Sequence, residues 1–232
     1  EEAQELSMPV LDERLFKSPA VALQQAKNAV VKMSRRAARN VNLAAPLLIK
    51  MDEDVVSAIN VRENLIDRME VEVSNYLIKM TDQELGDDES HAVTELLNFV
   101  TEFERIGDYG KKLLEYYAYR QNRPKDFSQQ AMTELSGMYA EAHHAIVTAL
   151  DGFINDDPDK AREVAPIAGK LRGLEVELRN RHIQRLDKQE CDSETGLVYV
   201  DILGIIEHIG YHSNNVAKAT ISSCTAEHKA KA

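Results

Sequence analysis

The spacing of apolar residues constrains the fold more than any other feature of this 232-residue sequence. Apolar residues recur at steps of three and four through several long stretches, and the first stretch begins at Ser18-Pro19. This period places them on one face of an α-helix, and a serine followed by proline is a typical helix start. Only 10 Gly and 6 Pro interrupt the chain, too few for the many tight turns of a β-rich fold. The sequence therefore predicts an all-α protein.

The pattern divides the chain into two similar halves. We expect an acidic linker over residues 1–17, a three-helix repeat over 18–120, a second linker over 121–127 and a second three-helix repeat over 128–232. Pro46 should kink or shorten the last turn of the first helix, because proline removes a helical hydrogen bond. The six helices are predicted at residues 18–48, 52–81, 88–119, 128–154, 159–186 and 193–224.

Two short sequence matches indicate that the halves are copies of one unit. Met69–Val73 reads M-E-V-E-V and Leu174–Leu178 reads L-E-V-E-L, at an offset of 105 residues. Glu104–Gly107 and Glu207–Gly210, E-R-I-G and E-H-I-G, match at an offset of 103. Two matches in the same order favour an internal duplication. A lone three-helix unit leaves one apolar face open, so we predict two tandem three-helix bundles related by a pseudo-twofold axis.

Charge and cysteine content limit the function classes. The formal net charge of −11 argues against a nucleic-acid partner and is compatible with cationic partners, including metals. Cys191 and Cys224 have no CxxC spacing and are expected to be reduced cytosolic thiols. No stretch approaches the ~20 apolar residues of a membrane span. The chain opens on Glu1 with no signal peptide, so we expect a cytoplasmic fragment of a longer protein.

A carboxylate pair is the most informative local motif. Glu104 and Asp108 are spaced i, i+4, so both project from one helix face, on the flank of the apolar seam. Glu63, Asp67 and Glu70 form a similar row on the preceding helix, and the two rows could enclose a carboxylate-rich groove. Carboxylate oxygens suit hard or borderline metals. Spacing alone favours the plainer interpretation, that these are solvated surface charges.

The residues around this pair resemble the PhoU family, whose motif reads E-R-I-G-D-H-x-x-N on the third helix of each repeat. Glu104–Lys112 reads E-R-I-G-D-Y-G-K-K, and Glu207–Asn215 reads E-H-I-G-Y-H-S-N-N. The resemblance implies an iron, zinc or manganese site on the bundle surface, with Glu104 and Asp108 as ligands in the first repeat and Glu207 in the second. Because Tyr211 replaces the expected Asp, it implies an impaired or empty second site.

A narrower resemblance lies upstream. Leu11–Leu23 is similar to the start of the cytoplasmic tail of bacterial sodium/phosphate cotransporters, in which a PhoU-like region follows the membrane domain. This resemblance implies a regulatory domain that controls phosphate uptake at the inner face of the plasma membrane. The partners it implies are a membrane transporter domain, in the same chain or separate, a sensor kinase and a second copy. The alternative is a free-standing PhoU protein acting on an ABC phosphate transporter and its sensor kinase.

No catalytic set is expected, and we predict that the protein is not an enzyme. A carboxylate-bridged di-iron enzyme in a helical bundle would need Glu-x-x-His on two helices, and the sequence has this spacing once only, at Glu141 and His144. His208 and His212 are spaced i, i+4, as two metal-binding imidazoles would be, but no third histidine lies near them in the sequence. We therefore expect them to be surface or interface residues.

Overall fold

The computed structural model describes residues 7–121, 127–191 and 193–230, and every regular element in these ranges is helical. This confirms the predicted all-α class. No helix in these ranges has an apolar stretch long enough to cross a lipid bilayer. The elements are η1 (Glu13–Lys17), α2 (Pro19–Leu47), α3 (Glu53–Met80), α4 (Asp87–Gln121), α5 (Gln129–Asn155), α6 (Pro158–Arg162), α7 (Val164–Asp187) and α8 (Ser193–Ala230).

Side-chain caps set several helix starts. The Asp52 carboxylate accepts hydrogen bonds from two backbone N–H groups of α3, and the Ser128 hydroxyl accepts one from α5. Asp157 caps α6 in the same way. The structure differs from the predicted helix over 159–186, because the chain breaks at Glu163 between the short α6 and α7. Pro46 lies in the last turn of α2, which ends one residue later.

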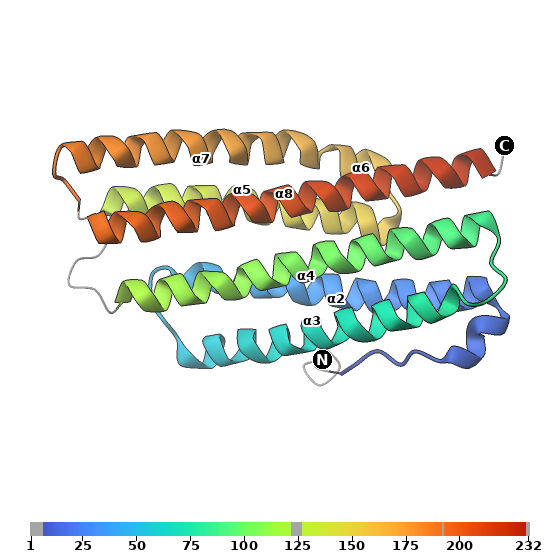
Figure 1. The fold of residues 1–232 in the computed structure, drawn as a ribbon. Helices are drawn as coiled ribbons and strands as arrows, with labels where there is room; N and C mark the ends of the chain where they lie inside the picture. Colours follow the sequence, from blue (N-terminus) through green and yellow to red (C-terminus); the bar gives the residue numbers. More distant parts are fainter. Residues whose placement is uncertain (1–6, 122–126, 192, 231–232) are drawn as a thin grey trace.

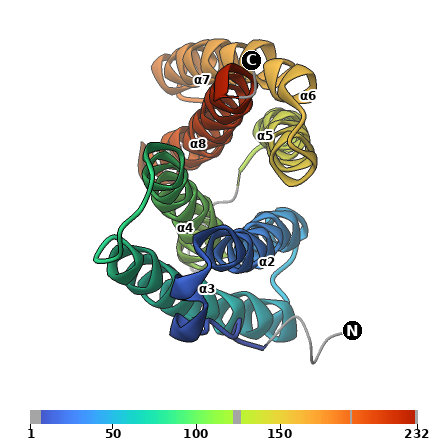
Figure 2. The ribbon, with the colours of Figure 1, turned by 90° about the vertical axis from the view of Figure 1, so that its right-hand side faces the viewer.

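The helices form two three-helix units that stack along their third helices (Figures 1 and 2). In the first unit α2, α3 and α4 pack on one another, and in the second α5, α7 and α8 do the same. Between the units α4 packs on α8, and α2 on α5. Contacts between equivalent helices are what a pseudo-twofold axis produces. The second helices, α3 and α7, lie at opposite ends of the stack in both views.

A group of phenylalanines joins the two units into one core. Phe153 of α5 packs its ring against Phe99 and Phe103 of α4, with ring centroids 4.4 and 5.2 Å apart. All three side chains are almost completely buried. The buried apolar residues of both units belong to one continuous cluster, so each unit covers the open face of the other.

The segment before α2 does not behave as a linker where it is described. Residues 1–6 lie outside the described part, but residues 7–17 pack against the first unit. The ring of Phe16 lies 4.9 Å from that of Tyr76, and the Tyr76 hydroxyl donates a hydrogen bond to the Asp12 carbonyl at 3.3 Å. The Ser7 carbonyl accepts a bond from Arg36 at 2.6 Å. The linker prediction overlooked the apolar residues Leu11, Leu15 and Phe16, which are half-buried against the core. The predicted linker at 121–127 lies almost entirely outside the described residues.

The glycine of the repeated motif has a packing role in both units. A Cβ on Gly107 of α4 would lie 3.0 Å from the Ile66 Cδ1 of α3. A Cβ on Gly210 of α8 would overlap Leu171 of α7, which is the equivalent residue at the 105-residue offset. Glycine therefore lets the third helix of each unit approach the second closely, at the level of the Glu104 motif and its copy.

The shared core gives a direct test of the packing between units. We expect Phe153→Ala to lower the free energy of unfolding by about 3–5 kcal/mol, because it leaves a cavity beside Phe99 and Phe103. Guanidinium unfolding followed by circular dichroism measures the loss. Val147→Ala on the same helix, at a side chain that is 49% exposed, should change it by less than about 0.5 kcal/mol. Equal losses in the two variants would contradict the shared core.

Candidate functional site

Glu104 and Asp108 lie one turn apart on α4, beside α3. Their side chains are 24% and 28% exposed, so they sit at the edge of the core and remain accessible to water. The Lys112 Nζ lies 2.8 Å from Asp108, and the Arg105 Nε lies 3.5 Å from Glu104. The structure thus places both predicted ligands on one accessible flank, where each already has a cationic neighbour.

Carboxylates from α3 crowd this flank. Burial raises the pKa of Glu104, and the negative charges of Asp108, Glu70 and Asp67 raise it further, against the opposing effect of Arg105. The two predicted rows of acids are therefore close enough to act on one another. In residues 7–121, 127–191 and 193–230, however, no three His, Cys, Asp or Glu side chains group closely enough to hold a metal ion. The acids have the right chemistry for a metal ion, but their carboxylates are not grouped closely enough in this structure to share one.

Glu63 departs from the prediction, because it is buried and not part of the exposed row. Glu63 is only 1% exposed, and one of its carboxylate oxygens accepts a hydrogen bond from the Asn40 side chain of α2 at 3.0 Å. Burial, with a contribution from Asp67 and Asp108, raises its pKa to about 8. The motif glycine makes room for it, since a Cβ on Gly107 would lie 3.0 Å from the Glu63 Oε2.

Asn40 and Arg62 complete this buried network, and the sequence analysis missed both. The Arg62 guanidinium donates to the Asn40 side-chain oxygen at 3.2 Å, and Asn40 also donates to the Ile59 carbonyl at 3.3 Å. Asn40 lies between Ala37 and Ala44 on the apolar face of α2, a place where a polar side chain needs a partner. That position was the signal available from sequence.

The equivalent face of the second unit has a different charge pattern. Arg172 of α7 stands at the position of Asp67, and its Nε lies 3.8 Å from Glu207 of α8. Tyr211, at the position of Asp108, is 44% exposed. A guanidinium therefore faces the carboxylate predicted as the second-repeat ligand, so this face has an internal cation where the first unit has an acid.

The two histidines spaced i, i+4 on α8, His208 and His212, lie beside α4. The His212 Nδ1 is 2.8 Å from Glu102, which also accepts from the Asn215 amide at 3.3 Å. The Tyr109 ring stacks on the His208 ring at 5.3 Å between centroids and contacts His212 at 5.5 Å. These contacts join α4 to α8 and fit the expected interface role.

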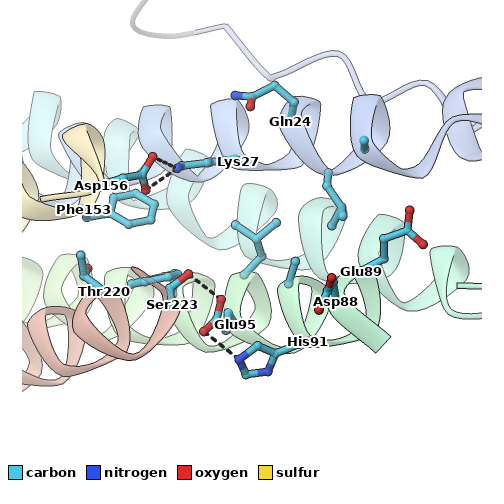
Figure 3. A pocket seen from close by; sticks show the side chains of 15 residues that line it. Gln24, Lys27, Asp88, Glu89, His91, Glu95, Phe153, Asp156, Thr220 and Ser223 are labelled. Atoms are coloured by element: carbon cyan, nitrogen blue, oxygen red, sulfur yellow. Dashed lines mark hydrogen bonds and ion pairs between the residues drawn. The ribbon is translucent and has the colours of Figure 1, made fainter. Parts of the chain in front are cut away.

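A pocket of about 590 Å³ lies where the ends of several helices from both units meet (Figure 3). Lys27 and Asp156 form an ion pair across it at 2.5 Å. Glu95 accepts a hydrogen bond from Ser223 at 2.6 Å, and the His91 Nε2 lies 3.2 Å from its other oxygen. The pocket is lined by residues of α2, α4, α5 and α8, so its shape depends on how the two units are docked. The sequence pattern did not predict it.

These observations define a class of protein: a duplicated three-helix bundle with an acidic flank on its first repeat. A sequence profile of the PhoU domain matches residues 30–117 and again residues 135–220. The chain therefore belongs to the PhoU family, and the two matches fall one in each unit.

Three proteins with similar sequences support the assignment of this chain to the PhoU family. The chain is 24% identical over 197 residues to the Phosphate-specific transport system accessory protein PhoU homolog 1 of Thermotoga maritima, covering 84% of each protein. It is 23% identical over 209 residues to the PhoU homolog of Clostridium acetobutylicum, covering 88% of this chain and 93% of that one. A third match is the putative inorganic phosphate export protein YjbB of Escherichia coli K12, 24% identical over 136 residues, which cover 58% of this chain and 25% of YjbB.

Solved structures share the fold. The crystal structure of PhoU from Pseudomonas aeruginosa superimposes with a TM-score of 0.81 at 18% identity, over 91% of this chain and 99% of that one. PhoU from Streptococcus pneumoniae gives a TM-score of 0.79 at 14% identity, over 90% and 98%. Identities this low show a common fold and nothing about ligands.

The buried carboxyl group predicts a pH dependence of stability. Folded Glu63 keeps its proton up to about pH 8, whereas in the unfolded chain it ionises near its ordinary pKa of 4.5. Between these values the folded state binds more protons, so the free energy of unfolding should fall as pH rises, by up to about 1.4 kcal/mol per pH unit. The Gln side chain cannot ionise, so Glu63→Gln should remove this component.

Urea unfolding from about pH 5 to about pH 8, in metal-free buffer, compares the two proteins. The matched control is Glu72→Gln, which removes an exposed carboxylate from the same helix and should keep the wild-type slope. The assignment of Glu63 is wrong if wild type and Glu63→Gln lose stability in parallel across this range.

Proposed function

We propose that the protein is a non-catalytic regulator of phosphate transport, acting in the cytoplasm as an accessory to a separate transport system. The observation that carries this proposal is the similarity to two phosphate-transport accessory proteins over most of their length. This favours the free-standing alternative over the cotransporter domain that the upstream residues suggested. A sensor kinase and a second copy of the chain are further proposed partners.

The cotransporter interpretation stays as a second candidate because of one observation. The match to YjbB covers only a quarter of a protein named for phosphate export. A region similar to this chain thus occurs within a longer protein whose name refers to phosphate movement. If the cotransporter interpretation holds, the transporter partner is part of the same polypeptide as this domain.

We also propose that the acidic flank of the first unit binds iron, zinc or manganese. Glu104 and Asp108 would hold the ion from α4, with Asp67 and Glu70 available from α3. Burial raises the pKa of Glu104 and the neighbouring carboxylates raise it further, and a cation would relieve the repulsion between these acids. Glu207 is the weaker candidate, because Arg172 already faces it. A bound ion would supply positive charge between α3 and α4.

A deletion strain tests the regulatory role. We expect loss of the gene to uncouple phosphate uptake from external phosphate, so that uptake of labelled phosphate stays high in phosphate-rich medium. Re-expression of the chain should restore the response. An unchanged uptake response in the deletion strain would contradict the proposal. Alkaline carbonate extraction of the native protein separates the two candidates: an accessory protein is released from membranes, and a transporter domain stays with them.

Metal analysis tests the acidic flank. After incubation with iron, zinc or manganese and dialysis, we expect wild-type protein to retain metal. Glu104→Gln and Asp108→Asn should each weaken binding at least about tenfold, because each removes a charged ligand. Glu207→Gln is the matched control in the second unit and should retain the wild-type amount. Absence of metal from wild type, or equal retention in all four proteins, would remove the metal site from the proposal.

A further inference from the structure

A second cavity, of about 480 Å³, lies at one end of the second unit, where α7 ends and α5 and α8 begin (Figure 1). Its lining residues come from these three helices and the segments next to them, so it is distinct from the pocket beside Lys27 and from the acidic flank. Polar side chains line much of it, among them those of His182, Arg185, Cys191 and Tyr199. A cavity of this size and lining suits a small polar molecule.

The first unit is apolar at the equivalent places. Four buried apolar residues of α3 and α4 correspond to lining residues of this cavity at the 105- and 103-residue offsets. The pairs are Leu77/His182, Met80/Arg185, Val93/Gly196 and Leu96/Tyr199. A three-helix unit of this family therefore packs here without polar groups. Because burying polar groups costs free energy, their presence in the second unit indicates a role beyond packing.

A buried ion pair organises the inner wall of the cavity. Arg185 donates to one carboxylate oxygen of Glu134 at 3.1 Å, and the Tyr199 hydroxyl donates to the other at 2.7 Å. Burial opposes the ionisation of Glu134, but these bonds outweigh it and lower its pKa. Arg181 lies 3.7 Å from the same carboxylate. The charge of Arg185 is therefore compensated by Glu134 within the wall.

His182 is the base in this wall. It is only 4% exposed, and its Nε2 has no hydrogen-bond partner among the described residues; this nitrogen faces Gly196, where a Cβ would overlap it. Burial and the charge of Arg185 lower the pKa of His182, against the effect of Glu134, so its ring is neutral near pH 7. The other ring nitrogen, Nδ1, lies 4.0 Å from the Cys191 Sγ. Contacts to a reacting group are often long before the reactant binds and tighten when it does.

Cys191 lies between α7 and α8 and is half-buried at the cavity. Glu190, which precedes it, also lines the cavity, and its negative charge disfavours a thiolate beside it. The thiol therefore needs a base within reach, and the Nδ1 of His182 supplies one. The residue equivalent to Cys191 in the first unit is Gly86, so neither member of the thiol–imidazole pair occurs there.

We propose that Cys191 is a modification site at which a low-molecular-weight disulfide forms a mixed disulfide, with His182 as the base. The Cys191 thiol gives its proton to the His182 Nδ1 while its sulfur attacks one sulfur of the disulfide. The S–S bond of the reactant breaks, and the leaving sulfur takes the proton from Nδ1 and departs as a thiol. The Cys191 sulfur is oxidised and the released thiol is reduced, so no further reactant is needed.

The cavity favours a disulfide as the reactant, because the half that stays attached to Cys191 needs room beside the sulfur. About 480 Å³ lies within the range of sites that hold small organic molecules. The hydroxyl and guanidinium groups of its wall suit the polar atoms of such a group. This inference goes beyond the proposed function and depends neither on it nor on metal binding.

Treatment of the full chain with glutathione disulfide tests the site. Intact-mass spectrometry follows the reaction, and peptide mapping assigns it to Cys191 or to Cys224, which is 9% exposed and has no such base assigned to it. At about pH 7 we expect Cys191 to react at least about tenfold faster in the folded chain than in urea. Between about pH 7 and about pH 8.5 its rate should stay nearly constant, because the proton moves within the pair. A thiol without a base slows about tenfold per pH unit below its pKa.

Two variants separate the base from a packing role. His182→Leu introduces the residue of the first unit, and circular dichroism checks its fold. It should slow Cys191 at least about tenfold at about pH 7 and match wild type at about pH 9.5, where the thiol ionises unaided. His144→Leu, at an exposed histidine of α5, is the matched control and should keep the wild-type rate. A wild-type rate that falls tenfold per pH unit, a rate that His182→Leu leaves unchanged, or reaction at Cys224 instead would overturn the proposal. The wild-type profile can do so whatever the stability of the variant.

Discussion

The open apolar face of a three-helix unit is the constraint on which this architecture depends. Each unit can cover its second helix from one side only, and the remaining apolar surface lies along its third helix. Packing α4 on α8 closes both surfaces at once, and Phe153 extends the closure to α5 by packing on Phe99 and Phe103. The central place of the third helices forces the second helices, α3 and α7, to the two outer sides (Figure 2).

This layering explains why one short motif has both packing and surface roles. On α4, Gly107 points to α3 and allows a close approach at Ile66, while Glu104 and Asp108 sit one turn apart on the exposed flank. The copy on α8 keeps the glycine, Gly210, and its contact with α7. The packing half of the motif is therefore retained in both units. The charged half is complete in the first unit only, because Tyr211 replaces the aspartate of the motif in the second. Arg172 of α7 also replaces the neighbouring acid, Asp67 of α3.

Much of this fold follows from sequence because helical periodicity and capping act locally. The long helices and the duplication could be predicted from spacing alone, and Glu104 and Asp108 were placed correctly on the flank. Glu63 was not, because its burial depends on the contact of α2 with α3, where Asn40 receives it. The pocket near Lys27 and Asp156 was also beyond prediction, since residues 129 positions apart meet there only when the units dock. Periodicity assigns a residue to a helix face, and tertiary packing decides which faces stay open.

The two units have diverged both in the core and on the surface. The buried Leu77 corresponds to a buried His182, and the acidic flank has become an arginine–carboxylate pair, yet Val71, Asn75 and Ile78 recur unchanged on the solvent side. Divergence of a core is tolerated when volume is compensated locally, and the His182 ring lies so close over Gly196 that a Cβ there would overlap it. The pseudo-twofold axis therefore relates two units whose flanks are electrostatically unlike, with crowded acids on the first and an arginine–carboxylate pair on the second.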